Sequence, residues 1–347
     1  MKLKFKNLSC SDVQKKFNYI QEVFDKQEND FQLEIDFSNL KWIEPIGMLF
    51  FGSKLREFII NNPDVEVKLG SIGEDSGYFK WMGLYDYFVP NSNVGKKVGH
   101  VHGNTNYIPI TKINVKTEYG ESFKNGNIYA DRGDYIEERA NQLAKIVTSD
   151  KQLEAILTYI IREIIRNVPE HSGVDEFWIC GQAWHGNLNK AQIAILDEGQ
   201  GIYNSLTSNI FHRREIDSNA KALQSALQPG ISKAFKKGGT NHKSDDVWAN
   251  SGYGLYVVSE ICRDCNGKFV LISGDNILIK ENDESCPFNG IIKDNHLKGT
   301  AIMIELPFMT DYQNINISDY VARGEKLAKQ GLHSIHQASI PSRGLLE

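Results

Sequence analysis

Cysteine is scarce in this sequence, long apolar runs are missing, and charge of neither sign is in large excess. The five cysteines are too few and too widely spaced for a disulfide framework in a chain of 347 residues. Cys262 and Cys265 lack a second Cys or His pair at zinc spacing, so we expect an ordinary reduced pair. No segment reaches the roughly 18 consecutive apolar residues of a membrane-spanning helix, and no charged and apolar leader is recognisable. These absences predict a cytoplasmic protein without a membrane partner.

The charge balance is mildly acidic, with 39 lysine and arginine residues, 44 aspartate and glutamate residues and a formal net charge of -5. Nonspecific nucleic-acid binding depends on a basic surface, so we do not expect nucleic acid as a partner. A chain of this length usually forms about two domains, each large enough to bury a core.

Four short motifs follow one another in the second half of the chain, at residues 163–167, 197–202, 252–255 and 299–300. Each alone is weak evidence, because single motif matches often mislead. Their order, their spacing and the hydrophobic segments around them together predict one nucleotide pocket. We therefore expect the chain to bind ATP together with Mg²⁺.

The first motif lies on a predicted helix at residues 151–168, where apolar residues recur with a helical period. Glu163 and Asn167 are four residues apart, so they share one face of that helix, which we expect to line the pocket. The Asn167 amide oxygen is a hard ligand for Mg²⁺, and the Glu163 carboxylate can orient or deprotonate a nucleophile. His171 either lines the pocket or caps the helix, because Pro169 disturbs the last turn. A solvated helix edge without a ligand is the alternative.

The second motif follows a predicted buried strand at residues 192–196, which ends in Asp197. A buried carboxylate there can accept a hydrogen bond from the exocyclic amine of adenine, whereas guanine would present a second acceptor. Gly199 and Gly201 permit backbone conformations and close approaches that a side chain would prevent. A hairpin turn without a ligand is the alternative for this motif alone.

The third motif opens a predicted helix with a glycine-rich sequence that contains Gly252, Gly254 and Leu255. Backbone N–H groups at such a helix start bind phosphate oxygens, and the helix dipole favours negative charge there. A plain glycine N-cap is the alternative. The fourth motif places Thr300 at the start of a strand, where its hydroxyl can hydrogen-bond near the base.

Together these motifs resemble the GHKL superfamily, which includes gyrase, the Hsp90 chaperones, MutL, sensor histidine kinases and anti-sigma-factor serine kinases. The resemblance covers residues 131–310 and implies an α/β (α+β) sandwich, in which a mixed sheet is covered on one face by helices. It also implies Mg-ATP held between this sheet and a lid at residues 203–250. Lys233 and Lys237 in this segment are candidate triphosphate contacts, and a solvated charge cluster is the alternative. The matched positions are Glu163 and Asn167 in the N box, Asp197, Gly199 and Gly201 in the first glycine box, Gly252 and Gly254 in the second, and Thr300 before the last strand.

Residues 1–90 form a predicted small α/β domain with right-handed crossovers. Its strands are expected at residues 33–37 and 65–69, and its helices at 47–60 and 78–84.

The sequence at residues 35–47, with Gly83 and Leu84, resembles a STAS domain, the fold of anti-sigma-factor antagonists. In those antagonists the turn before the helix bears a phosphorylated serine or threonine. This chain has Glu44, Pro45 and Ile46 there, so no hydroxyl is available at that turn. We therefore expect a docking or scaffold domain without a phosphorylation switch.

The remaining segments connect or follow these two units. Residues 91–130 are expected to form a linker with an edge strand around 107–110, and residues 131–147 a helix that leads into the N-box helix. The tail at 311–347 is polar, with one amphipathic helix at 318–332 and an end that is expected to be unstructured. This tail either docks a partner or is disordered.

Three functions in different classes fit these motifs. The first is a slow Mg-dependent ATPase whose lid closure controls a protein partner. The second is a serine/threonine protein kinase of the anti-sigma-factor type that acts on a STAS-like partner. The third is a noncatalytic switch, in which ATP binding alone changes the choice of partner. We expect a STAS-like or sigma-factor-like protein partner, or a homodimer.

Overall fold

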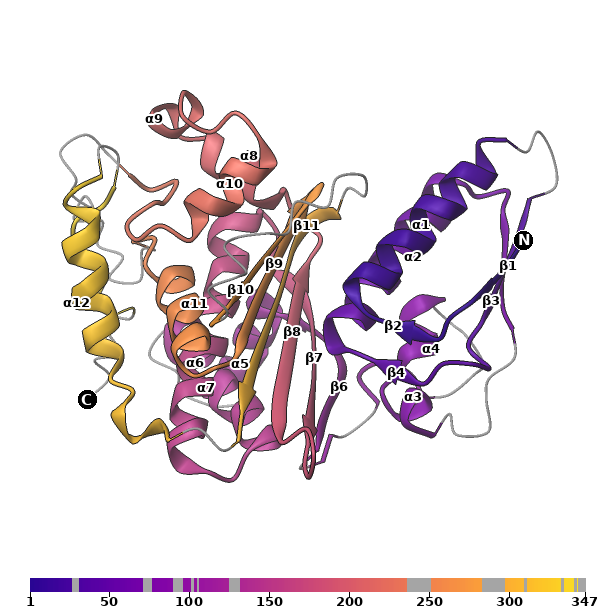
Figure 1. Ribbon diagram of the computed structural model, residues 1–347, viewed down its shortest axis with the longest axis horizontal. Helices are drawn as coiled ribbons and strands as arrows, with labels where there is room; N and C mark the ends of the chain where they lie inside the picture. Colours follow the sequence, from indigo (N-terminus) through magenta and orange to yellow (C-terminus); the bar gives the residue numbers. More distant parts are fainter. Residues whose placement is uncertain are drawn as a thin grey trace.

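Helices and strands alternate along the whole chain in a mixed α and β architecture (Figure 1). The computed structural model describes residues 1–26, 31–70, 77–89, 96–100, 103–104, 106–124, 132–235, 251–282, 297–308, 311–331, 334–339 and 342. In chain order the elements are β1 (Lys2–Lys4), β2 (Asn7–Leu8), α1 (Cys10–Phe24), β3 (Gln32–Asp36), β4 (Trp42–Ile43), α2 (Pro45–Asn61), β5 (Glu66–Leu69), α3 (Gly77–Trp81), α4 (Leu84–Phe88), β6 (Tyr107–Asn114), α5 (Val115–Lys124), α6 (Arg132–Val147), α7 (Lys151–Asn167), a π-helical turn (Val168–Ser172), β7 (Glu176–Trp184), β8 (Lys190–Asp197), α8 (Gly201–Thr207), α9 (Ile210–Arg213), α10 (Asn219–Ala226), α11 (Gly254–Asp264), β9 (Lys268–Gly274), β10 (Asn276–Glu281), β11 (Leu297–Pro307), a 3-10 turn (Tyr312–Asn314) and α12 (Ile317–Ala328).

A six-stranded sheet in the order β10-β9-β11-β8-β7-β6 forms the centre of the second half of the chain. Among the described residues, every neighbouring pair in this sheet is antiparallel, which corrects the expected mixed sheet. The physical reason is that short turns join β7 to β8 and β9 to β10, and a hairpin reverses the chain direction. The edge strand expected near residues 107–110 is present as β6.

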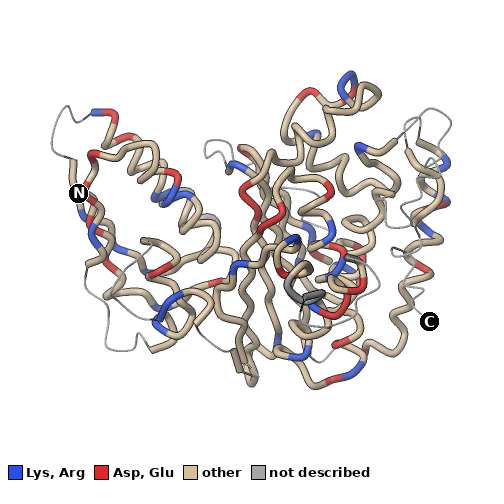
Figure 2. The backbone as a smooth tube through the Cα atoms, turned by 180° about the vertical axis from the view of Figure 1, so that it is seen from behind, with Lys and Arg blue, Asp and Glu red and all other residues tan. Residues whose placement is uncertain are grey.

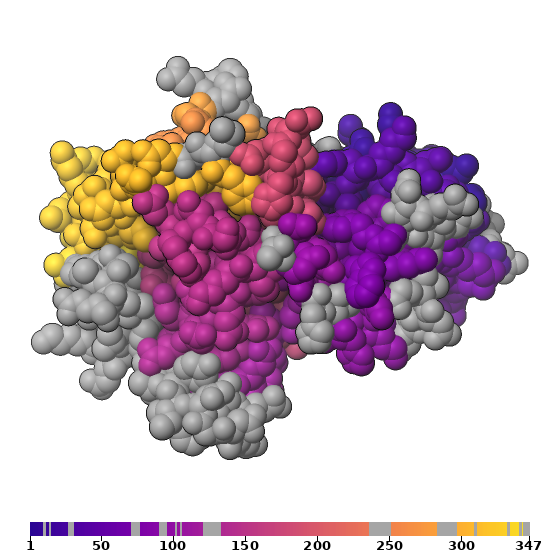
Figure 3. All heavy atoms as spheres, turned by 90° about the horizontal axis from the view of Figure 1, so that it is seen from below, coloured from indigo at the N-terminus to yellow at the C-terminus, as the bar shows by residue number. Residues whose placement is uncertain are grey.

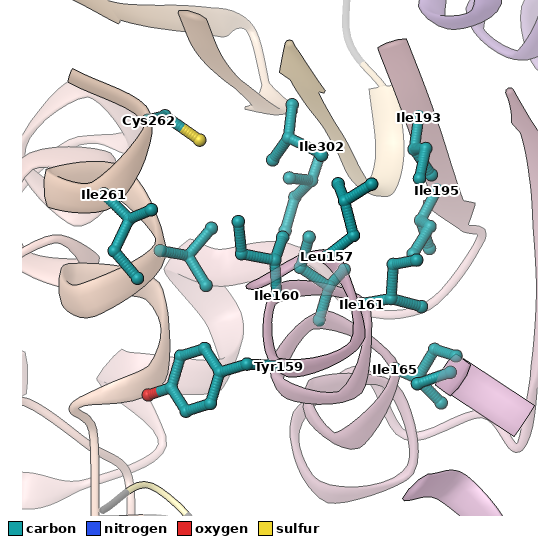
Figure 4. Close-up of a cluster of buried hydrophobic side chains, with 14 of the residues drawn as sticks. Leu157, Tyr159, Ile160, Ile161, Ile165, Ile193, Ile195, Ile261, Cys262 and Ile302 are labelled. Carbon is teal, nitrogen blue, oxygen red and sulfur yellow. The ribbon is translucent and has the colours of Figure 1, made fainter. Parts of the chain in front are cut away.

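Helices α6, α7 and α11 cover one face of this sheet (Figure 1). Helix α7 begins where the Asp150 carboxylate accepts hydrogen bonds from the backbone N–H groups of Gln152 and Leu153, at 2.9 and 2.8 Å. Its apolar side chains fill the space between α11 and strands β8 and β11 (Figure 4). This layer fixes the position of α7 relative to both glycine motifs.

Helix α2 from the N-terminal part packs against the other face of the six-stranded sheet, so helices lie on both faces rather than on one. The N-terminal part also has its own parallel sheet, in the order β1-β3-β5. Strands β3 and β5 and helix α2 confirm elements expected there, and α3 and α4, separated at Gly83 with φ of 75°, replace the single helix expected at residues 78–84. Helix α1 was not anticipated. The N-terminal residues occupy one end of the molecule and the C-terminal residues the opposite end (Figures 1 and 3).

The C-terminal tail differs from expectation in its described part. Helix α12 confirms the predicted amphipathic helix and packs beside α11. Beyond it, Ile335, Ala338 and Ser342 are buried against the rest of the protein, so these residues are not part of an unstructured end. Apolar burial and backbone hydrogen bonds hold them in place.

Acidic and basic residues are interspersed over both parts of the chain (Figure 2). Within the described ranges, no helix has the length and apolar character needed to cross a membrane.

Candidate functional site

One pocket lies where α7, the π-helical turn, β8, α8, β11 and the start of α11 meet. Seven of the predicted site residues line it, namely Asn167, Asp197, Gly201, Gly252, Gly254, Leu255 and Thr300. Isoleucines from α7, β8 and β11 form apolar walls suited to the faces of a planar ring. The free space is about 80 Å³, so a nucleotide needs some of the surrounding groups to move before it can enter.

Asp197 is the last residue of β8 and is only 6% exposed. Its Oδ1 accepts a hydrogen bond from the backbone N–H of Gly199 at 2.9 Å, and Thr300 is its register partner on β11. Burial raises the pKa of Asp197 to about 7, although backbone hydrogen bonds from Gly199 and Thr300 work in the opposite direction. The sequence motifs that contain Asp197 and Thr300 are therefore brought together at one end of the pocket.

The first glycine motif folds tightly around this carboxylate. Gly201 has φ of 75°, a conformation that glycine adopts without strain, and it begins α8. The Ser273 hydroxyl on β9 accepts a hydrogen bond from the Ile202 backbone N–H at 3.0 Å, which fixes the start of α8 against the sheet. Gly199 lies outside the pocket lining and packs against Ser172, which is part of that lining.

Glu163 also lies outside the pocket lining, which corrects the expectation that it lines the pocket beside Asn167. Its carboxylate is 1% exposed, and its Oε1 accepts hydrogen bonds from Arg162 Nη2 at 3.0 Å and Arg166 Nη1 at 3.4 Å. Burial works against the positive charge of both arginines, but attraction to Glu163 raises their pKa. This buried ion-pair cluster holds Glu163 behind the pocket instead of at its surface.

The second glycine motif brings Glu163 close to the start of α11. A Cβ atom at Gly254 would lie 2.4 Å from Glu163 Oε2, so only glycine allows this approach. Tyr253, the N-cap residue, makes no side-chain capping hydrogen bond to α11. The start of α11 thus lies against Glu163 Oε2, and a helix N-terminus of this kind is suited to a phosphate group.

The end of α7 carries the remaining predicted groups. The helix stops at Asn167, and residues Val168–Ser172 form a π-helical turn, a feature often found at functional sites. His171 lines the pocket rather than capping the helix, and burial lowers its pKa to about 3, assisted by the charges of Lys233 and Arg166. His171 is therefore neutral at physiological pH.

The lid residues expected to contact a triphosphate are only partly described. Burial lowers the pKa of Lys233, whereas its attraction to Glu170 opposes this change, so Lys233 lies near the end of α7. Lys237 and the glycines at 238 and 239 lie outside the described residues. The described part of residues 203–250 contains α9 and α10, and Gly230 follows α10 with φ of 81°.

The described residues contain no group of three or more His, Cys, Asp or Glu side chains placed to hold a metal ion. An Mg²⁺ ion bound with a nucleotide needs few protein ligands, because phosphate oxygens and water complete its shell. Cys262, near the end of α11, and Cys265, just after it, are both buried in the core.

Sequence reasoning missed two contributions to this site. Arg162 neutralises Glu163 from the preceding position on α7, and Ser342 reaches the same carboxylate from the C-terminal tail. Consecutive residues of a helix do not share a face, so periodicity did not indicate the contact of Arg162 with Glu163, and no local pattern connects residue 342 to α7.

No protein-family model matches the chain, and no curated protein matches it significantly. The motifs and the geometry of the pocket therefore carry the argument for function.

Proposed function

We propose that the chain is a Mg-dependent ATPase of the GHKL type, in which closure of a lid at residues 203–250 controls a protein partner. The observation that supports this most strongly is convergence: Asn167, Asp197 and the start of α11 come from distant segments and meet at one pocket. A buried acceptor, apolar walls and a helix N-terminus are the groups that a purine nucleotide requires.

In this proposal Asp197 accepts a hydrogen bond from the adenine amine, and Thr300 orients the same end of the base. Ile195 and Ile302 pack against the ring, and both line the pocket. Backbone N–H groups at Gly254 and Leu255 bind the phosphates, and Asn167 supplies a ligand to Mg²⁺. The bound Mg-ATP supplies the phosphoryl group, and the protein positions it.

Glu163 is proposed as the group that accepts a proton from the attacking nucleophile. Arg162 and Arg166 bind its Oε1, which leaves Oε2 directed toward the start of α11. This arrangement fixes the orientation of the carboxylate before a nucleophile arrives. The resulting ATPase is expected to be slow, because water must reach a carboxylate that is 1% exposed.

The N-terminal part is proposed as a STAS-like docking unit without a phosphorylation switch. Glu44 is the N-cap residue of α2, and Pro45 and Ile46 are buried. The Pro45 carbonyl accepts a hydrogen bond from Cys180 Sγ on β7 at 3.4 Å. The start of α2 thus contacts this chain's own six-stranded sheet, which supports a scaffold role for this end of the helix.

A protein kinase of the anti-sigma-factor type is the second candidate. The observation that favours it is a serine hydroxyl, that of Ser342, which donates a hydrogen bond to Glu163 Oε2. A hydroxyl beside the proposed base is the arrangement that phosphoryl transfer to serine requires.

The test measures Mg-ATP affinity by titration calorimetry and phosphate release by the purified chain. At pH 8, above the raised pKa of Asp197, Asp197→Asn should weaken ATP binding at least about tenfold, as the loss of a charge-assisted hydrogen bond predicts. Glu163→Gln should keep binding and lose roughly 100-fold or more in turnover. Asp64→Asn, an exposed carboxylate in the N-terminal part, is the matched control and should change neither quantity.

The outcomes separate the candidate functions. Equal ATP affinity in the wild type and Asp197→Asn, or no binding by the wild type, would refute the nucleotide pocket. Binding without phosphate release or protein labelling would instead identify a noncatalytic switch.

A further inference from the structure

The C-terminal tail returns from α12 to the second glycine motif and is fastened there by hydrogen bonds. The Ile335 backbone N–H donates to the Gly230 carbonyl at 2.7 Å, and the Tyr253 hydroxyl donates to the Ile335 carbonyl at 2.7 Å. Further along, the Ser339 backbone N–H donates to the Ser251 hydroxyl at 2.8 Å. The tail therefore follows the segment that leads into α11.

Ser342 is the point where the tail reaches α7. Its side chain is 0% exposed, and its hydroxyl donates a hydrogen bond to Glu163 Oε2 at 3.3 Å. Its carbonyl accepts a hydrogen bond from the Tyr159 hydroxyl at 3.0 Å, and the hydroxyls of Ser339 and Ser342 lie 3.1 Å apart. Contacts on the backbone and the side chain thus hold this hydroxyl against a single carboxylate oxygen.

The two oxygens of Glu163 have different surroundings. Oε1 is bound by two arginines, so it is the oxygen that carries the ion pairs. Oε2 accepts a hydrogen bond from the Ser342 hydroxyl and lies 2.4 Å from where a Cβ atom of Gly254, the first residue of α11, would be. A base, a nucleophilic hydroxyl and a phosphate-binding helix start therefore converge at one place.

We propose that Ser342 is a phosphorylation site, and that the chain transfers phosphate to it from ATP bound in its own pocket. This inference rests on the proposed ATP site and deepens it by naming a protein acceptor.

The step balances without any further reactant. Glu163 Oε2 takes the proton from Ser342 Oγ as that oxygen forms a bond to the γ-phosphorus. The bond between the γ-phosphorus and the bridging oxygen breaks, and ADP leaves with its electron pair. Glu163 then returns the proton to solvent. The 3.3 Å hydrogen bond is long, but such contacts commonly shorten when substrate binds.

The experiment incubates the purified full-length chain with Mg²⁺ and γ-labelled ATP. Peptide mass spectrometry locates the phosphate, and ATP affinity is measured in parallel by titration calorimetry. We expect one phosphate per chain, at Ser342. Because the transfer is intramolecular, its first-order rate constant should not depend on protein concentration. Ser342→Ala should reduce incorporation at least tenfold while ATP affinity stays within twofold of the wild type.

Three further variants define the specificity of the labelling. Ser318→Ala removes an exposed serine from α12 and should label as the wild type does. Ser339→Ala removes the neighbouring hydroxyl and should keep phosphate at Ser342. Glu163→Gln should bind ATP and lose labelling at least tenfold.

The two proposals fail in different ways. If ATP binds and is hydrolysed but no phosphate appears on Ser342, the acceptor assignment is wrong and the ATPase stands. If phosphate appears on Ser339, or if the rate constant for labelling rises with protein concentration, intramolecular transfer to Ser342 is overturned. If ATP does not bind at all, both proposals fail together, and the parallel titration identifies that case.

Discussion

At the scale of single residues, Asp197 combines a charge-bearing group with an environment that disfavours charge. Burial raises its pKa from 3.8 to about 7, so the folded protein holds this proton more tightly than the unfolded chain does. The neutral form therefore stabilises the fold at low pH. That contribution is lost as the pH rises from about 4 toward 7, with an upper limit near 1.4 kcal/mol per unit of pKa shift.

The first prediction follows from this sign. Asp197→Asn cannot ionise, so its free energy of unfolding relative to the wild type should increase between pH 4 and pH 7, by roughly 2–4 kcal/mol. Urea unfolding at four pH values measures this difference. His171 has a lowered pKa and an opposite pH dependence, but it is present in both proteins and largely cancels. A constant difference, or the same trend in Asp64→Asn, would contradict the raised pKa.

The residue types of the pocket were predictable from sequence, but the direction of one side chain was not. Asp197 was expected at the end of one strand and Thr300 at the start of another, and the structure pairs these two strands at those residues. Glu163 lies on a helix with 13 buried positions among its 17 residues. A helix buried on nearly every side has no unique polar face, so periodicity could not distinguish the pocket surface from the arginine cluster behind it.

At the scale of elements, helix α2 is joined to the first glycine motif by polar contacts. Glu198, which follows Asp197, accepts hydrogen bonds from Ser53 at 2.8 Å and from Arg56 at 2.5 Å. The Arg56 guanidinium also lies 4.1 Å from the Tyr87 ring centre and 5.0 Å from that of Trp178. A movement of α2 would therefore displace Glu198, which is adjacent in sequence to Asp197, the proposed adenine contact.

The second prediction tests this connection with a double-mutant cycle. Arg56→Met and Glu198→Gln should each weaken ATP binding about two- to fivefold. In urea unfolding of the two single variants and the double variant, the coupling energy between the two residues should be near 1 kcal/mol. The coupling is modest because Glu198 is 42% exposed and solvent screens the pair. Lys54→Met, whose ion pair stays within α2, should leave ATP affinity unchanged. Strictly additive effects would show that α2 and the glycine motif are independent.

Several elements carried too little local signal to be predicted. Strand β10 is short, and among the described residues it pairs with β9 at the edge of the sheet. Strand β6 and helix α7 were identified because each has a clear apolar pattern of its own. The packing of α2 on the six-stranded sheet depends on contacts between distant segments, which a single sequence does not specify.

At the scale of the whole molecule, the C-terminal tail is hydrogen-bonded to the start of α11 through Ile335 and to α7 through Ser342. Figures 1 and 3 show the C-terminal segment at the end of the molecule opposite the N-terminal part. The tail and α2 therefore reach the proposed ATP site from different sides. Helix α2 contacts the first glycine motif, and the tail contacts the second.

The third prediction asks whether the tail restrains the site. Ile335 is 1% exposed, so Ile335→Ala should lower the free energy of unfolding by roughly 2–4 kcal/mol. Because Ile335 is hydrogen-bonded to Gly230 and Tyr253, loosening it should free Ser342 from Glu163 and admit water. We therefore expect ATP turnover to rise severalfold while phosphate on Ser342 falls.

Leu327→Ala on α12 is the matched control for this prediction, because Leu327 is 45% exposed and should cost less than about 0.5 kcal/mol. Urea unfolding, phosphate release and peptide mass spectrometry on the same samples provide the three readouts. If stability falls in Ile335→Ala while turnover stays at the wild-type level, the tail only supports the fold. If turnover rises while phosphate on Ser342 is undiminished, water reaches Glu163 without Ser342 moving away from it, and the proposed link between the two is wrong.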